Sequence, residues 1–418
     1  MNMKFRNISG YKFVIIAVGI AVYLGASMCD TLNSSDRFTK IKHANGKIYA
    51  GSETCKSCHA DIVRSYRLTA HFNTSAVATT DNIRGSFDSA TNYFRYNTRM
   101  EVDMEKRNGK AFQVAYIGGK EWLSAPFDII IGSGNKGQTY LYWNKKTLFQ
   151  LPVSFYAPLN EWCNSPGFPS DMILFNRIIP GQCMECHTTA FKTLSVGENR
   201  ETYEVPQAIY GIDCERCHGP SAEHVSFHLD HPEAKEGGLI TRYLTLNRQQ
   251  KLDACAMCHS GLRKAIKSSF AFLPGDQLNE YSLPNYNIDT AALLDVHGNQ
   301  YGLLAVSKCF KVSGTMNCST CHNVHVKESE RQEQVFSKRC ISCHTSLSHS
   351  FDKQGDPGLA DNKCIDCHMP ALPSAKIFMS VTGKEQTVAD LIRTHRIAIY
   401  PEETKKIIKA QNYISSKR

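Results

Sequence analysis

Apolar and polar residues alternate most clearly in one stretch of the chain. Alternation at 102–104 and again at 112–116 flanks Asn108-Gly109. Period-two alternation on both sides of an Asn-Gly pair predicts an antiparallel hairpin. Further strand-like runs follow at 127–131, 139–143 and 148–156. Together these runs predict a small antiparallel β insertion over residues 93–160.

The rest of the chain has only short apolar patterns. Helices are expected at 60–70, at 222–230 and at 385–393, and glycine and proline pairs such as Gly219-Pro220 interrupt anything longer. The pattern therefore predicts a mainly α and irregular core that carries the β insertion. The expected organisation is an N-terminal signal or anchor (1–28), a linker (29–50), a first segment (51–92), the insertion (93–160), a core (161–400) and a basic tail (401–418).

A glycine-rich stretch inside the insertion matches G-x-G-x-x-G. Gly132 to Gly137 is followed by Gln138-Thr139-Tyr140-Leu141-Tyr142-Trp143, which favours a strand. A dinucleotide-binding loop would instead open a helix and be followed by an acidic residue about 20 positions later. We therefore interpret this stretch as a β-turn, with a dinucleotide loop as the alternative.

The N-terminus has the pattern of an export signal. Lys4, Arg6 and Lys12 precede an apolar run at 13–26, which is short for a membrane-spanning helix. Cys29 lies just beyond that run, where a lipidated cysteine would stand. A removed signal peptide, a lipoprotein signal and an uncleaved anchor are the three alternatives. Each predicts a periplasmic protein, and the last two predict contact with a membrane surface.

The pattern Cys-x-x-Cys-His occurs seven times, where a shuffled chain of this composition would contain about 0.03 copies. Two thiols at this spacing can add to the two vinyl groups of a haem, and the adjacent histidine then becomes an axial iron ligand. Zinc sites do not require a histidine after every second cysteine, and a redox dithiol would occur once. The sequence therefore predicts seven covalently attached c-type haems. The attachment cysteines are Cys55, Cys58, Cys183, Cys186, Cys214, Cys217, Cys255, Cys258, Cys318, Cys321, Cys340, Cys343, Cys364 and Cys367. The proximal histidines are His59, His187, His218, His259, His322, His344 and His368.

Charge and the remaining cysteines add little to this interpretation. The formal net charge of +9 over 418 residues would be offset by the haem propionates, so nucleic-acid binding is not expected. Cys163 and Cys309 remain once haem attachment and Cys29 are set aside. A disulfide between them and two free thiols are both consistent with export.

Nine further histidines could provide the second axial ligands. His71 would be ~18 Å from His59 on a continuous helix, so the two cannot share an iron. His322 and His325 would point the same way and serve different haems. We therefore expect interlaced ligation, in which one segment's spare histidine binds another segment's haem. The predicted distal ligands are His71, His224, His297, His325, His349 and His395, with His228, His43 and His231 ranked below them, and Met316 and Met369 as sulfur alternatives.

Several stretches resemble a known family. They are Gly51-Ser52-Glu53-Thr54-Cys55, the segment from Cys217 to His224, the segment from Asp295 to Gln300, and Cys367-His368-Met369-Pro370. In these the chain resembles the multihaem cytochromes related to the tetrahaem electron acceptor of hydroxylamine oxidoreductase. The resemblance implies distal roles for His224 and His395, haems stacked in pairs, and respiratory electron transfer. Seven motifs exceed the tetrahaem pattern, and the β insertion has no counterpart in it.

Two functions are compatible with these residues. The first is an electron relay in a respiratory chain whose partners are redox proteins or a membrane quinol-linked complex. The second is an enzyme that reduces or oxidises nitrite, hydroxylamine or a similar nitrogen or sulfur species at a five-coordinate haem. The supply of spare histidines favours the relay, and no catalytic residue is predicted.

Overall fold

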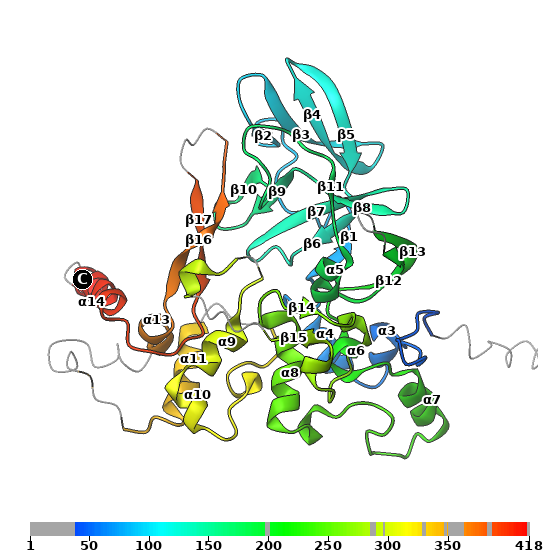
Figure 1. Cartoon of the computed structure of the whole chain (residues 1–418), viewed down its shortest axis with the longest axis vertical. Coiled ribbons are helices and arrows are strands. Elements are labelled where there is room, and N and C mark those ends of the chain that lie inside the picture. Colours follow the sequence, from blue (N-terminus) through cyan, green and yellow to red (C-terminus); the bar gives the residue numbers. More distant parts are fainter. Residues whose placement is uncertain are drawn as a thin grey trace, which may run out of the picture.

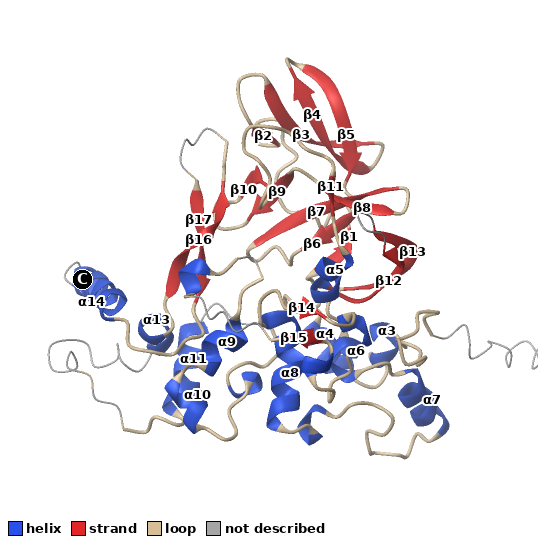
Figure 2. Ribbon diagram, viewed as in Figure 1, coloured by secondary structure: helices blue, strands red, loops and turns tan. Residues whose placement is uncertain are grey.

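The computed structural model describes residues 38–196, 201–284, 290–295, 297–327, 332–346, 349, 363–382 and 387–415. Strands gather in one half of the molecule and short helices in the other (Figures 1 and 2). The described residues are 28% helix and 27% strand, so the prediction of a mainly α and irregular core was wrong. Much of the additional strand content lies outside the expected insertion. Two long hairpins form within segments that were expected to be helical or irregular.

The helices are short. They are α3 (Ser52–Cys55), α4 (Ala60–Tyr66), α5 (Gly181–His187), α6 (Cys214–His218), α7 (Ala222–Asp230), α8 (Arg248–His259), α9 (Gln300–Ala305), α10 (Lys308–Val312), α11 (Gln332–Ile341), α13 (Cys364–His368) and α14 (Pro401–Ser415). The helix expected at 222–230 is confirmed as α7, and the one expected at 60–70 ends early, at Tyr66. Gly219, at φ +79°, ends α6 because glycine adopts this conformation without strain.

A four-stranded antiparallel sheet forms the far end of the β half. Its order is β2 (Tyr93–Arg95), β3 (Met100–Arg107), β4 (Lys110–Ile117) and β5 (Lys120–Pro126). The predicted Asn108-Gly109 hairpin is confirmed, and both turn residues have positive φ, at 49° and 76°. Val102 and Met104 pair with Ala115 and Gln113 on the buried face. The Gln113 amide is satisfied there, since it donates to the Val153 carbonyl and accepts from the Val153 amide.

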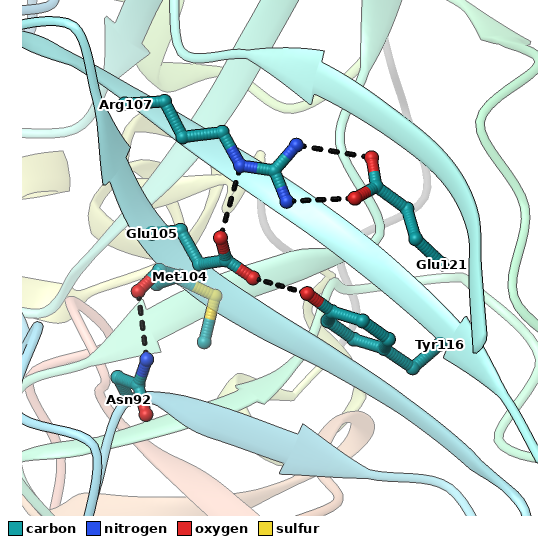
Figure 3. A network of polar contacts seen from close by, with 6 residues as sticks. All are labelled: Asn92, Met104, Glu105, Arg107, Tyr116 and Glu121. Carbon is teal, nitrogen blue, oxygen red and sulfur yellow. Dashed lines mark hydrogen bonds and ion pairs between the residues drawn. The ribbon is translucent and has the colours of Figure 1, made fainter. Parts of the chain in front are cut away.

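The other face of this sheet carries a charged network (Figure 3). Arg107 donates to both carboxylate oxygens of Glu121, at 3.0 and 2.9 Å, and to Glu105 at 2.9 Å. The Tyr116 hydroxyl donates to the second oxygen of Glu105 at 2.7 Å. On the β2 side, Asn92 donates to the Met104 carbonyl at 2.9 Å. A bidentate arginine contact joins the β3–β4 hairpin to β5.

A seven-stranded antiparallel sheet connects this end to the helices. It contains β1 (Ser75–Val77), β6 (Ile129–Ile131), β7 (Gly137–Asn144), β8 (Thr147–Gln150) and β11 (Arg177–Ile178) in that order, with β9 (Val153–Tyr156) on β7 and β10 (Glu161–Asn164) on β9. The stretch from Gly132 to Gly137 connects two antiparallel strands, β6 and β7, and a strand follows it as expected, so it does not open the helix that a dinucleotide loop requires. A buried cluster that includes Tyr140, Phe127 and Trp162 packs the two sheets together.

Two long hairpins extend from the helical half. One is β12 (Thr188–Val196) with β13 (Glu201–Tyr210), and the other is β16 (Ala371–Met379) with β17 (Val388–Arg393). A short pair, β14 (Lys264–Ala265) with β15 (Ser282–Leu283), lies between the helices. The expectation of a helix at 385–393 was wrong. The described part of this segment forms β17, which pairs with β16.

The β16–β17 hairpin packs on the seven-stranded sheet. Val381 forms a β-bridge with Cys163, and the Asn164 amide donates to the Ser380 carbonyl. Cys163 is buried in this contact, whereas Cys309 lies on α10, and both are free thiols. Cys29 and the rest of the proposed export signal lie outside the described residues. None of the helices in the described ranges has the length and apolar character needed to cross a membrane.

Candidate haem-binding sites

Each Cys-x-x-Cys-His motif occupies about one helical turn. Five motifs lie at least partly in α3, α5, α6, α8 and α13, the fifth motif begins in a 3₁₀ turn at Cys318–Thr320, and the sixth begins near the end of α11. Residues three and four apart share one helix face, so this turn presents both thiols and the histidine to the same side. This arrangement would allow two thioether bonds to one haem and would place the imidazole as an axial ligand of its iron.

Four proximal histidines face a second histidine from another motif segment. The ring centroids of His259 and His71 are 5.9 Å apart, and those of His218 and His325 are 6.2 Å apart. The pairs His322–His395 and His368–His349 are separated by 6.2 and 6.3 Å. An iron between two imidazoles, with metal–nitrogen bonds of about 2 Å, places the ring centroids about 6 Å apart. The residues present therefore fit a haem iron held from both sides.

Two further proximal histidines have a neighbouring histidine at longer range. His187 interacts electrostatically with His297, and His224 interacts with His59. Burial lowers the pKa of His187 to about 4, and burial likewise lowers the pKa of His259 to about 4. These imidazoles are neutral at pH 7, which is the form that ligates a metal.

Each of the six predicted distal histidines thus lies near a proximal histidine of a motif other than the one that precedes it in the sequence. His349, for example, follows the sixth motif and lies near His368 of the seventh. His322 lies near His395 and His325 lies near His218, so the two would serve different haems, as predicted. The weaker candidates lie elsewhere. His43 is buried beside Tyr49, His228 lies against His224 at 4.6 Å, and His231 stacks on Phe227 at 4.7 Å. The alternative role of Met316 and Met369 as sulfur ligands stays a prediction.

The motifs are themselves neighbours. Thiols from different motifs lie close enough to shift one another's pKa in four pairs: Cys55–Cys214, Cys186–Cys258, Cys255–Cys318 and Cys340–Cys364. Electrostatic contacts add two links, from Cys217 to Cys258 and from Cys321 to Cys343. In chain order the first, third, fourth, fifth, sixth and seventh motifs form one continuous series, and the second motif branches from the fourth.

Two charged residues inside the third motif hold this arrangement together. The buried Glu215 carboxylate accepts from the amides of Ala50 and Gly51 and from the amide and hydroxyl of Ser221. Burial raises the pKa of Glu215, and these donors oppose that rise by stabilising the ionised form. Glu215 therefore fastens the segment before the first motif to the third.

The neighbouring Arg216 is also buried. Its guanidinium donates to the carbonyls of Glu185 and Ser269, and it contacts Cys258. It thus lies where the second, third and fourth motifs meet. The sequence analysis did not identify either residue. A signal was available, because a haem-attachment motif is expected to be buried and charged residues are rarely buried without partners.

Replacing Arg216 by glutamine should lower the reduction potential of the fourth-motif haem by tens of millivolts. A buried cation close to a haem favours its reduced, less positive state, and local charge is one of the protein's means of setting the potential. Potentiometric titration followed by absorbance would measure the shift. Arg263→Gln provides a control, because Arg263 binds Ser282 and Asn279 near the β14–β15 pair. An equal shift in both variants would contradict the assignment.

The chain is similar in part to one known family and to two known proteins. The model of the family described as cytochrome c554 and c-prime matches residues 176–219, which contain the second and third motifs. The multiheme cytochrome MtrA of Shewanella baltica (strain OS185) is 23% identical over 198 residues, which is 45% of each chain. The chain therefore spans less than half the length of this relative. The outer cell wall cytochrome OcwA has a similar solved structure, with a TM-score of 0.49, 18% identity, and coverage of 86% of this chain and 81% of that one.

In its repeated attachment motifs, its facing imidazoles and its match over residues 176–219, the chain is similar to multihaem c-type cytochromes. The motif cysteines are the residues that would hold haem c covalently.

Proposed function

We propose that this protein carries seven haems and acts as an electron relay in the periplasm, as part of a respiratory chain. The observation that carries the proposal is the continuous series of neighbouring motifs, from Cys55 to Cys364 through the third, fourth, fifth and sixth motifs. The haems would supply the one-electron chemistry. The chain's contribution is to hold their attachment sites side by side.

The imidazole pairs support the same role. An iron with two histidine ligands changes little in geometry when its charge changes, and it has no open position for a substrate. Six of the seven motifs place a second histidine near the proximal one. Such sites favour electron exchange over catalysis.

The partners and the location belong to this proposal too. The N-terminal pattern supports export, with Cys29 as a candidate lipid anchor, and the partners would be redox proteins or a membrane quinol-linked complex. The narrower relation to the tetrahaem electron acceptor of hydroxylamine oxidoreductase is part of this proposal, and the family match over 176–219 overlaps one of the resembling segments at 217–219.

Removing individual motifs tests the relay. The intact mass of the wild type should exceed that of the processed polypeptide by seven haem masses. Cys183→Ala with Cys186→Ala should leave six haems and preserve electron passage between the ends of the series, because the second motif is a branch. Cys255→Ala with Cys258→Ala should also leave six haems but interrupt passage, because the fourth motif is a junction.

Each variant is the control for the other, because both lose one haem-attachment site and differ only in the position of that site in the series. Stopped-flow reduction from a soluble donor would measure passage, and intact mass would show that the other six haems are attached. Equal rates in both variants, or four or fewer haems in the wild type, would contradict the proposal.

A further inference from the structure

A carboxylate orients one of the predicted distal ligands. The Asp295 carboxylate oxygen Oδ1 accepts from the His297 backbone amide at 2.9 Å and lies 3.0 Å from Nδ1 of the same residue's imidazole. One oxygen therefore contacts both the backbone and the ring, which limits rotation of the imidazole. When Nδ1–H donates to Asp295, the other ring nitrogen, Nε2, is left for a metal.

The turn that carries this pair is fastened at both ends. The carbonyl of the buried Leu294 accepts from the Ser374 hydroxyl of β16 at 3.0 Å. The Gly298 amide donates to the Asp295 carbonyl at 3.1 Å, and the Asn299 side chain then caps the N-terminus of α9. The fold around the turn thus sets the position of the carboxylate beside the imidazole.

The proximal partner of His297 is also oriented through Nδ1. This partner is His187 of the second motif, which interacts electrostatically with His297. The Thr74 hydroxyl oxygen lies 3.0 Å from Nδ1 of His187. Both imidazoles therefore keep Nε2 for an iron, in agreement with ligation from two sides.

The acceptor on His297 differs in charge from the acceptors on other ligands. Nδ1 of His218 and Nδ1 of His368 lie 3.1 and 2.8 Å from backbone carbonyl oxygens, and Nδ1 of His187 lies beside a hydroxyl. A carboxylate forms a stronger hydrogen bond and makes the imidazole a more basic ligand. A more basic ligand stabilises the oxidised, more positive iron, so it lowers the reduction potential of the haem.

The second motif is the branch of the series. Its Cys186 and Cys258 of the fourth motif form one of the neighbouring thiol pairs described above, so the branch meets the series at the fourth motif. An electron on the second-motif haem would move into the series through the fourth-motif haem. The difference between these two potentials therefore decides whether the branch releases electrons or retains them.

We propose that Asp295 is a positioning residue that acts through His297 and holds the second-motif haem at a lower potential than the fourth-motif haem, so that the branch passes electrons into the series. The inference rests on the proposed relay and deepens it, because it assigns a direction to the branch. In this step a ferrous second-motif haem gives one electron to a ferric fourth-motif haem. No bond forms or breaks.

Asp295→Asn tests the proposal, because asparagine keeps the size and an acceptor oxygen but removes the charge. We expect the second-motif haem to stay low spin and its equilibrium with the fourth-motif haem to shift about tenfold toward a reduced second haem, which is about 59 mV for one electron. Potentiometric titration followed by absorbance and electron paramagnetic resonance would measure potential and spin state. The variant Cys183→Ala with Cys186→Ala identifies the second-motif component as the one that it lacks.

Two controls separate this effect from a general change in charge or structure. In the variant without the second-motif cysteines, Asp295→Asn should leave the six remaining potentials unchanged, because the haem on which it acts is absent. Asp390→Asn removes a carboxylate that binds Lys136 and Tyr156 on the seven-stranded sheet. It should leave all seven potentials unchanged.

The possible failures are distinguishable. An unchanged potential in Asp295→Asn, or an equal shift in Asp390→Asn, would overturn the proposal. A high-spin second-motif haem in Asp295→Asn would also overturn it, since the carboxylate would then be needed for ligation itself. Failure of the relay would appear in the wild type, as four or fewer haems by mass or as no electron passage between the ends of the series.

Discussion

Replacing His395 by alanine should convert one haem from low spin to high spin while all seven stay attached. The His395 ring faces His322 at 6.2 Å with an interplanar angle of 24°, the separation expected across one iron. Without this imidazole, the iron of the fifth motif would keep only His322. Its reduction potential should rise, by on the order of 0.1 V, because a nitrogen ligand that stabilises the oxidised iron is lost.

The backbone around His395 should survive this change. The Ser307 hydroxyl donates to the His395 carbonyl, and the Ile397 amide donates to the same hydroxyl at 2.8 Å. Intact mass, electron paramagnetic resonance and potentiometry would measure attachment, spin state and potential. His231→Ala is the control, since that ring stacks on Phe227 and should leave the spectra unchanged. An unchanged low-spin spectrum in His395→Ala would reject its role as a ligand.

Gly211→Ala should destabilise the protein by about 3 kcal/mol or more. Gly211 has φ +70°, and an added Cβ would lie 2.1 Å from the Phe72 carbonyl oxygen, a backbone atom that cannot rotate away. The Gly211 amide also donates to Ser75, and its carbonyl accepts from Thr189. The β13 end and the segment after α4 would have to separate to relieve the clash.

This separation should also disturb a haem site at a distance. The Ile212 amide donates to the His71 carbonyl at 2.9 Å, so His71 would move with Phe72 and lose its position opposite His259. We expect thermal unfolding at a lower temperature and one additional high-spin haem. Gly118→Ala is the control, because Gly118 has φ +59° but nothing within 4 Å of the added Cβ, and should cost about 1 kcal/mol. Equal destabilisation in both variants would show that the loss of stability comes from the positive φ alone. The clash with the Phe72 carbonyl would then contribute nothing.

The sequence predicted local features well because neighbouring residues determine them. The Asn108-Gly109 hairpin formed as expected, since both turn positions require positive φ. Helix α7 matched its expected bounds. In contrast, residues 388–393 form a strand despite a helical expectation, because pairing with Ala371–Met379 outweighs a weak local preference.

The partners of the buried charges in the third motif were beyond local prediction. Nothing near Glu215 in the sequence indicates that the amides of Ala50 and Gly51, about 165 positions earlier, would satisfy its carboxylate. Such contacts depend on which distant backbone groups lack a partner, and only the folded chain determines that.

The sequence by itself determined where the seven predicted haem-attachment units of this protein lie. Two cysteines and a histidine within five residues form a haem-attachment unit wherever they occur, since one helical turn is enough to present them together. The tertiary structure alone decided which histidine faces which and which motifs are neighbours. The physical reason is that a second axial ligand must approach from the opposite face of the haem. A residue on the same turn cannot reach that face, so the ligand must come from a segment that only long-range folding brings near.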